Sequence, residues 1–147
     1  MADFRRTASA VWNGDLRGGN GTISATSGIF TDVPYSFVTR FDNTPGTNPE
    51  ELIAAAHAAC YSMAFANSLA KKGIQPTSIT TKATTVFSPK EGGGFRVSRM
   101  ILEVEGVVAG LDQAGFQREA EEGEKACPIS ALLRPGVDAI EVHATLK

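Results

Sequence analysis

The longest pattern in the chain is an uncharged apolar stretch that predicts one long helix. The stretch 52–70 contains no Asp, Glu, Lys or Arg. Both flanks carry residues typical of helix ends: Asn48, Pro49 and Glu51 at the start, and Lys71, Lys72 and Gly73 at the end. A helix that is apolar on every side is usually buried on every side. We therefore expect a central buried helix over residues 48–72.

The segments around this helix carry strand signals, with alternation at residues 7–12 and many β-branched residues in the two segments 78–87 and 95–108. The first forty residues predict a β-meander, with strands at 7–12 and 21–25 and an extended segment at 37–41. The remainder predicts strands at 78–87 and 95–108, a helix at 111–125, a helical turn at 129–133 and a closing strand at 138–146. This order indicates a single α+β domain over residues 1–147 with antiparallel sheets.

The expected burial of the long helix indicates a homodimer. A helix that packs on one sheet leaves its opposite side in water, and an uncharged helix has no side suited to water. A second copy of the same chain is the simplest cover. The alanines at 54–56, 58 and 59 would let another backbone approach closely.

Composition excludes several classes of function. The chain has 14 basic and 16 acidic residues, for a formal charge of −2, and no basic cluster longer than a pair, so nucleic acid is not the expected partner. The uncharged stretch is rich in alanine and contains His57, Ser62, Asn67 and Ser68, so we do not expect a membrane span. No secretory signal pattern occurs in residues 1–10, which predicts a reducing cytoplasmic location for the two cysteines.

The two cysteines, Cys60 and Cys127, allow three interpretations. In the first, they are buried core residues, since free cysteine is among the most buried residue types. In the second, they are zinc ligands together with His57 and His143, although the paired spacing of structural zinc sites is absent. In the third, they are a redox pair, which requires a thiolate, a partner thiol and a nearby cation.

A thiolate at Cys60 would need a positive charge from elsewhere in the fold. Cys127 precedes Pro128 and a predicted helical turn, where backbone amides favour a thiolate, whereas Cys60 lies mid-helix and gains little from its own helix dipole. Arg40 stays protonated in any environment and precedes the long helix. Glu50 can hold that guanidinium in a bidentate ion pair.

Spacing on the helix means that Glu50 can serve a Cys60 site only from a second subunit or through a very long relay, which favours a site shared between subunits. Glu50 and Cys60 are ten residues apart, or roughly 15 Å along one helix. His57, three residues before Cys60, is either a base or, as we expect, a hydrogen-bonded core histidine. His143 is expected to be exposed, and Ser130 to lie in a turn without a His/Asp grouping.

Several of these segments resemble the OsmC/Ohr family of thiol-dependent hydroperoxide reductases, on the OsmC side. The resemblance covers nearly the whole chain and is carried by Thr47-Asn48-Pro49-Glu50-Glu51-Leu52, Ala54-Ala55-Ala56-His57-Ala58-Ala59-Cys60, Gly21-Thr22-Ile23-Ser24, Pro34-Tyr35, Phe37, Thr39-Arg40-Phe41 and Cys127-Pro128-x-Ser130.

The resemblance implies a role for each candidate residue. Cys60 would be the peroxidatic cysteine and Cys127 the resolving one, with Arg40 stabilising the thiolate and Glu50 orienting the arginine. Ohr-type members supply the arginine from nearer the N-terminus, where this chain has Arg17; the context of Arg40 favours the OsmC arrangement. The family fold is an intertwined homodimer with two sites at the subunit interface.

The implied activity is the reduction of organic hydroperoxides, with hydrogen peroxide as a further substrate. An external dithiol, of lipoyl type in the family, would restore the thiols, and no cofactor or metal is implied. Phe37, Phe41, Met63 and Phe65 would line an apolar channel or belong to the core. The alternatives are a non-catalytic cysteine redox sensor and a metal-binding module.

Overall fold

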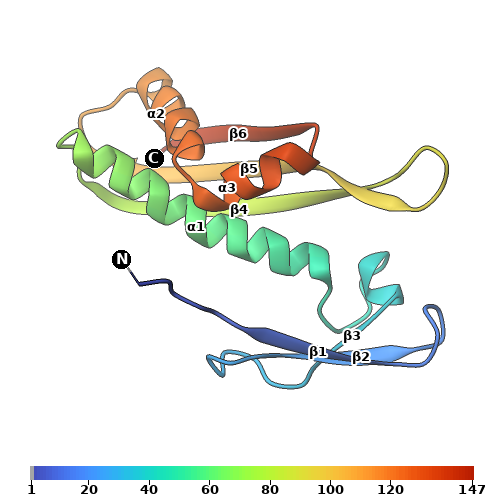
Figure 1. The fold of residues 1–147 in the computed structure, drawn as a ribbon. Coiled ribbons are helices and arrows are strands. Elements are labelled where there is room, and N and C mark those ends of the chain that lie inside the picture. Colours follow the sequence, from blue (N-terminus) through green and yellow to red (C-terminus); the bar gives the residue numbers. More distant parts are fainter. Residues whose placement is uncertain (1) are drawn as a thin grey trace. The chain divides into compact units, whose positions relative to one another are not determined.

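The chain divides into two compact units in the computed structural model, which describes residues 2–147. The first unit ends at Leu52 and the second begins at Ile53. The elements follow in the order β1 (Ala8–Asn13), β2 (Asn20–Ala25), β3 (Val33–Ser36), the 3₁₀ helix η1 (Val38–Arg40), α1 (Pro49–Lys71), β4 (Pro76–Pro89), β5 (Phe95–Val108), α2 (Gln113–Lys125), α3 (Pro128–Leu133), the 3₁₀ helix η2 (Arg134–Gly136) and β6 (Ala139–Leu146) (Figure 1). The α+β class predicted from the sequence is confirmed.

The first unit contains a three-stranded antiparallel sheet in the order β1-β2-β3. The extended segment predicted at 37–41 is wrong, because residues 38–40 form η1. Ser36 and Thr39 exchange hydrogen bonds, each side-chain oxygen accepting from the other residue's backbone N–H at 3.2 Å. Such local side-chain bonds compete with strand pairing and close a turn.

The second unit places three helices on one face of a sheet in the order β4-β5-β6 (Figure 1). Strand β5 shows why this face is covered: its even-numbered residues from Ser98 to Val108 are buried, while most odd-numbered ones are exposed. That period of two is the pattern of a sheet with one dry face.

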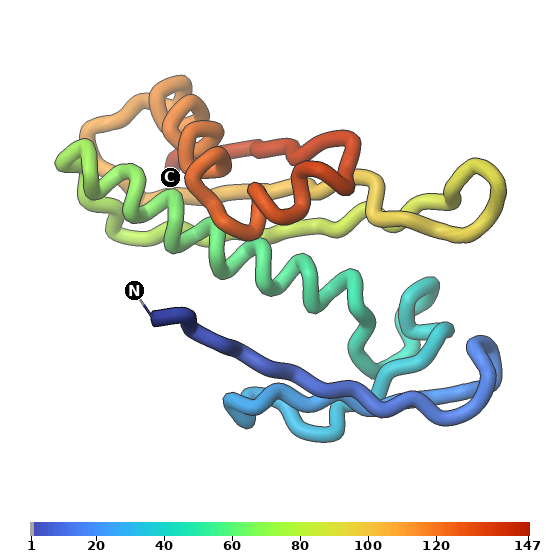
Figure 2. The backbone as a smooth tube through the Cα atoms, viewed as in Figure 1, coloured from blue at the N-terminus to red at the C-terminus, as the bar shows by residue number. Residues whose placement is uncertain are grey.

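The prediction of purely antiparallel sheets is wrong for this second sheet. Strands β4 and β5 form an antiparallel hairpin, but β5 and β6 run parallel, with Leu102 opposite Val142. Parallel neighbours need a long crossover connection, and the segment between them, which includes α2 and α3, supplies it. Figure 2 traces this crossover from orange to red. Side chains alternate in the same way in parallel and antiparallel strands, so the sequence pattern of β6 does not reveal its direction relative to β5.

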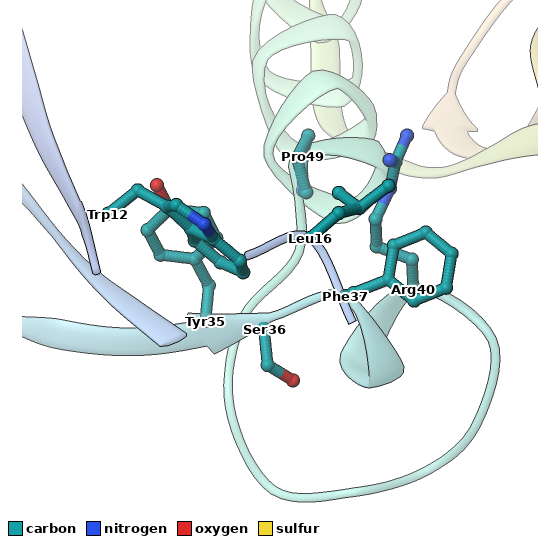
Figure 3. Close-up of a pocket in the computed structure, with 7 residues that line it drawn as sticks. All are labelled: Trp12, Leu16, Tyr35, Ser36, Phe37, Arg40 and Pro49. Carbon is teal, nitrogen blue, oxygen red and sulfur yellow. The ribbon is translucent and has the colours of Figure 1, made fainter. Parts of the chain in front are cut away.

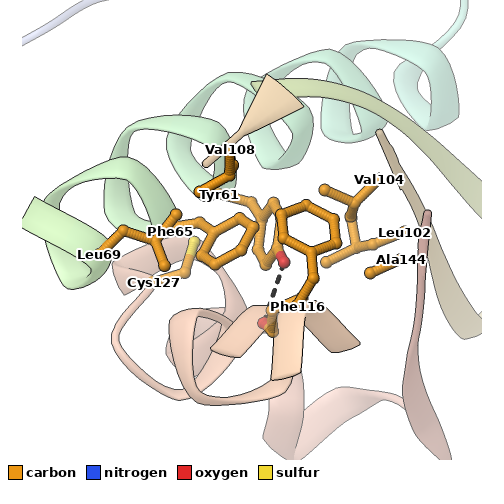
Figure 4. Packing of buried hydrophobic residues seen from close by; sticks show 10 residues of the cluster. Tyr61, Phe65, Leu69, Leu102, Val104, Val108, Phe116, Cys127 and Ala144 are labelled. Carbon is orange, nitrogen blue, oxygen red and sulfur yellow. Dashed lines mark hydrogen bonds between the residues drawn. The ribbon is translucent and has the colours of Figure 1, made fainter. Parts of the chain in front are cut away.

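The apolar core of the second unit forms where the helices meet the sheet. Tyr61, Phe65 and Leu69 from α1 pack with residues of β5, α2 and β6 (Figure 4). Phe65 and Phe116 lie with ring centroids 5.4 Å apart. Gly123 permits this close packing of α2, since a Cβ there would lie 2.9 Å from the Phe65 ring.

Helix α1 begins and ends close to its predicted limits. The Asn48 side chain accepts from the backbone N–H of Glu51 at 2.8 Å, and Gly73 adopts a φ of 77° just beyond the end. The following helix, α2, begins two residues later than predicted. Asp112 caps it by accepting from Gly115, which leaves Leu111 outside the helix and packed on the core.

Complete burial of α1 is not found in the single chain. Its buried side chains form one stripe with a spacing of four residues, His57, Tyr61, Phe65 and Leu69. The opposite side, with Ala55, Ala56, Ala59 and Met63, is exposed. Among residues 2–147, α1 is the one helix long and apolar enough to cross a membrane, a test that core helices also pass.

Candidate active site

In the first unit, Arg40 and Glu50 form the ion pair that the sequence predicted. Nη2 of Arg40 donates to Oε1 of Glu50 at 2.6 Å, and Nε lies 3.2 and 3.3 Å from the two carboxylate oxygens. Glu50 is buried and the Arg40 side chain is 29% exposed. Two donors on one carboxylate fix the plane of the guanidinium.

The elements around this ion pair are joined by a small polar network. The hydroxyl of buried Thr39 donates to the carbonyl groups of Ser36 and Thr47, each at 2.9 Å. The Asn48 side chain, which caps α1, donates to the Thr39 carbonyl at 3.1 Å. The network therefore fixes η1, which carries Arg40, against the start of α1, which carries Glu50.

Arg40 also lines a mostly apolar pocket of about 270 Å³ within the first unit. Figure 3 shows the lining side chains, which are Trp12, Leu16, Tyr35, Ser36, Phe37, Arg40 and Pro49. Phe37, one of the four residues expected to line an apolar channel or to belong to the core, lines this pocket, and Phe41 packs against Phe37 with ring centroids 4.9 Å apart. The other two residues of the predicted channel do not line this pocket: Phe65 is fully buried core and Met63 is exposed.

In the second unit, the fold brings the two thiols together. Cys60 on α1 and Cys127 at the start of α3 are free cysteines whose side chains are hydrogen-bond partners. Cys127 is buried in the apolar core and Cys60 is partly buried against it. Sixty-seven residues separate them in sequence, so the contact depends on how α3 packs on α1.

The surroundings of Cys60 act on its pKa in opposite directions. Burial, the largest influence, raises the pKa of the Cys60 thiol, and the Cys127 side chain raises it further. The backbone N–H of Ile129 donates to Cys60 and lowers this pKa. A fully formed thiolate at Cys60 therefore needs additional positive potential, as the sequence argument required.

The first-turn amide of α3 serves a different cysteine from the one expected. From the sequence, Cys127 is expected to benefit from this helix N-terminus, and it is the N-cap residue of α3. The amide of Ile129 instead donates to the sulfur of Cys60. The sequence signal for this short helix is Pro128 directly after Cys127, at the first helical position. Which of the two thiols lies near the Ile129 amide depends on tertiary packing, so the sequence contains no signal for it.

His57 and Ser130 form a buried pair that the sequence argument missed. Ser130 lies within α3, and its Oγ is 2.7 Å from Nε2 of His57; both residues are fully buried. The prediction of a turn serine without a histidine partner is wrong, since these residues lie 73 positions apart and only the fold joins them. His57 is the hydrogen-bonded core histidine that we expected.

The pKa of His57 is lowered by burial, while the negative charge of nearby Glu124 opposes this effect. Glu124 is itself buried on α2 and accepts from Arg134 with both oxygens, at 2.7 and 2.8 Å. Two contacts therefore hold the short helix α3 in place. Ser130 joins it to α1, and Arg134, the residue after its end, joins it to α2. His143 is exposed, as predicted, and lies 3.5 Å from Glu141.

The predicted site residues thus form two pairs, Arg40 with Glu50 and Cys60 with Cys127, in different units of the chain. Arg17 lies in a turn in which Asp15 accepts from its backbone N–H. Among residues 2–147, no group of three or more His, Cys, Asp or Glu side chains could hold a metal ion.

Comparison with known proteins shows what the chain is similar to. A family model described as OsmC-like protein matches residues 41–141. The chain is 43% identical over 131 residues to peroxiredoxin OsmC of Escherichia coli (strain K12), covering 89% of this chain and 91% of that protein.

Solved structures share the fold. The organic hydroperoxide resistance protein OhrB of Bacillus subtilis matches with a TM-score of 0.73 and 24% identity, covering 95% of this chain and 98% of that one. An organic hydroperoxide resistance protein OsmC from Legionella pneumophila matches with a TM-score of 0.72 and 20% identity, covering 99% of both chains. With the family model matching well over half of its length, the chain belongs to the OsmC-like protein family.

Proposed function

We propose that this protein is a thiol-dependent peroxidase that reduces organic hydroperoxides, and hydrogen peroxide as a second substrate, and so protects against oxidative stress. The observation that carries the proposal is the contact between Cys60 and Cys127, two free thiols brought together by the fold. The relatives named as a peroxiredoxin and as organic hydroperoxide resistance proteins support the same activity.

The proposed reaction has three steps. The Cys60 thiolate attacks the distal peroxide oxygen, the O–O bond breaks, and an alcohol or water leaves after taking up a proton. The resulting Cys60 sulfenic acid condenses with the Cys127 thiol, which forms the disulfide and releases water. An external dithiol, of lipoyl type as in the family, then restores both thiols by exchange.

Arg40 is assigned the electrostatic role in this reaction. A guanidinium keeps its charge at any working pH, so it can stabilise the thiolate whose pKa burial raises, and the charge that develops on the leaving oxygen. Glu50 is assigned the orientation of Arg40, which its contacts with two guanidinium nitrogens support. Arg40 also borders the apolar pocket, which would bind the organic group of the hydroperoxide.

We further propose a homodimer in which each long helix is covered by the second copy. The exposed small residues of α1, together with Met63, form an uncharged face that water would otherwise contact. Glu50 and Cys60 are ten residues apart on α1, roughly 15 Å by helical rise, which exceeds the reach of a carboxylate side chain. We therefore assign to each Cys60 the Arg40–Glu50 pair of the partner subunit.

The chemistry needs neither a metal nor an organic cofactor, because sulfur carries both redox states. Two free cysteines suit a reducing compartment, so we propose a cytoplasmic location. We treat residues 1–147 as one functional domain, because the proposed site draws on residues of both units.

Steady-state turnover tests the proposal. Purified protein should consume cumene hydroperoxide repeatedly in the presence of dihydrolipoamide. Cys60→Ser should abolish consumption, whereas Cys127→Ser should reduce one equivalent and leave a sulfenic acid that dimedone traps. A redox sensor would instead stop after about one peroxide per site with dithiol in excess.

Heterodimers test the shared site. Glu50→Ala and Cys60→Ser proteins are each expected to be weakly active or inactive, and mixing them should restore activity once subunits have exchanged. Differently tagged copies would report the exchange directly. Exchange without any recovery would argue against an Arg40–Glu50 pair acting across the interface.

A further inference from the structure

The buried hydrogen bond between His57 and Ser130 joins the same two segments of the chain as the contact between the two thiols. His57 lies three residues before Cys60 on α1, and Ser130 lies three residues after Cys127 in α3. His57 and Cys60 therefore share one face of α1, and Cys127 is the N-cap residue of the short helix that carries Ser130. The hydrogen bond and the thiol contact therefore join the same two elements, about one helical turn apart.

We propose that the His57–Ser130 hydrogen bond is a positioning device that holds Cys127 against Cys60, so that disulfide formation outruns over-oxidation of Cys60. This inference rests on the proposed peroxidase function. His57 and Ser130 are positioning residues and take no part in bond making.

Helix α3 needs such a device because it has only six residues. A helix this short has little stability of its own, so its placement depends on tertiary contacts. Its contact with α1 through Ser130 is fully buried at 2.7 Å, where water cannot compete for either partner. The ion pair of Arg134 with Glu124 holds the other end of α3 against α2 rather than α1.

The unpaired nitrogen of His57 indicates the direction of the hydrogen bond. Among residues 2–147, Nδ1 of His57 is the buried side-chain nitrogen or oxygen without a hydrogen-bond partner. An unpaired buried N–H is rarer in proteins than an unpaired buried acceptor. We therefore assign the proton to Nε2, which donates to Oγ of Ser130. A residue that replaces His57 must then present a donor at the position of Nε2.

Two reactions compete for the Cys60 sulfenic acid. In the first, the Cys127 sulfur attacks the Cys60 sulfur, the S–O bond breaks, the S–S bond forms, and the hydroxyl group leaves as water with the thiol proton. In the second, a further hydroperoxide transfers an oxygen to the Cys60 sulfur, which yields sulfinic acid and an alcohol. The first depends on the placement of Cys127, while the second depends only on peroxide concentration.

The test compares the two products in reduced protein mixed with increasing cumene hydroperoxide and no dithiol. Mass spectrometry gives the fractions of disulfide and of Cys60 sulfinic acid. In Ser130→Ala and His57→Leu, the peroxide concentration that gives half sulfinic acid should fall about fivefold, the factor expected for one net hydrogen bond. The rate of the first oxidation of Cys60, followed at low peroxide, should stay unchanged.

His57→Gln and Ser62→Ala serve as matched controls. Gln keeps an N–H donor and should retain most of the wild-type product ratio, which a general loss of packing would not allow. Ser62 lies two residues after Cys60 and binds Ala58 and Thr81, at 2.9 and 2.8 Å, so its replacement removes a hydroxyl from α1 without touching α3. It should leave the product ratio unchanged.

Wild-type product ratios in both Ser130→Ala and His57→Leu would overturn the positioning role, and so would an equal shift in Ser62→Ala. Each comparison is made on variants with the wild-type circular dichroism spectrum, and either of the first two variants suffices. Failure of the proposed function would look different, because the wild-type protein itself would then form neither the Cys60–Cys127 disulfide nor sulfinic acid.

Discussion

The two units of the chain differ in what they bury. In the second unit, aromatic and aliphatic side chains of α1, α2, β5 and β6 enclose Cys127 in an apolar core. Within residues 2–52, the buried residues are Gly21, Thr39 and Glu50, and large apolar side chains such as Phe4 and Ile29 are exposed. The second unit holds the two thiols in or against a dry core, and the first holds the Arg40 guanidinium and the Glu50 carboxylate.

This difference matters because burial and thiolate formation oppose each other. The dry setting that brings Cys60 and Cys127 together also raises the pKa of Cys60. A guanidinium buried in the same core would carry a large desolvation cost. On the first unit, Arg40 is partly exposed and remains hydrated, and Glu50 fixes its orientation.

Removal of a core ring from the second unit is expected to have the largest effect on stability. Phe65→Ala should lower the free energy of unfolding by about 3–5 kcal/mol, because Phe65 is fully buried against Phe116. Phe4→Ala is the matched control, since Phe4 is 86% exposed and its loss should change stability little. Urea unfolding of the two variants measures both effects; similar losses would contradict the assignment of the core.

The next largest effect concerns the cation of the first unit. Arg40→Gln should lower kcat/KM for cumene hydroperoxide by about 10²–10³-fold, the range for loss of one electrostatic stabiliser. In a Cys127→Ser background, the same change should move the pH midpoint of Cys60 alkylation upward. Arg17→Gln is the control for the other candidate arginine. A larger loss with Arg17→Gln than with Arg40→Gln would exchange their roles.

A smaller effect is expected when the orientation of that cation is loosened. Glu50→Gln keeps an acceptor for Arg40 but removes the charge, so kcat/KM should fall about tenfold, consistent with weakening one charge-assisted hydrogen bond. Glu51→Gln, at the exposed neighbouring position, is the control. Equal losses in both variants would indicate a general charge effect at the start of α1.

The dry setting of the second unit predicts a specific dependence of stability on pH. Burial lowers the pKa of His57, so the unfolded chain takes up a proton near pH 6.5 while the folded chain does not. The contribution of His57 to stability is therefore complete above pH 6.5 and is lost as the pH falls, by at most about 1.4 kcal/mol per pH unit. Chemical denaturation between pH 5 and 8 should show a shallower fall in His57→Gln than in wild type.

The smallest effect is expected on the wet face of the second sheet. Lys82 and Glu103 lie 2.8 Å apart with side chains 74% and 52% exposed. Exposed ion pairs contribute little, so Lys82→Ala should cost about 0.5 kcal/mol or less. Thermal unfolding at low and high salt measures this. A loss comparable to that of Phe65→Ala would mean that this face is covered rather than wet.

The sequence predicted the features that depend on local chemistry. The end signals around α1 placed it within one residue at each end, and the β-branched content of residues 95–108 predicted the strand that the structure contains as β5. The ion pair of Arg40 with Glu50 was also predicted, and the structure contains it. The helix and the strand can be predicted from neighbouring residues, and the ion pair from the opposite charges of its two side chains.

Only the tertiary structure decided features that join distant segments. The parallel pairing of β6, the contact of Cys60 with the amide of Ile129 and the bond of His57 with Ser130 each link residues far apart in the chain. Local patterns encode which face of an element is apolar, but not which other element will cover that face or in which direction it will run. In this chain, the packing of α3 on α1 brings together both thiols, the amide of Ile129 and the buried His57.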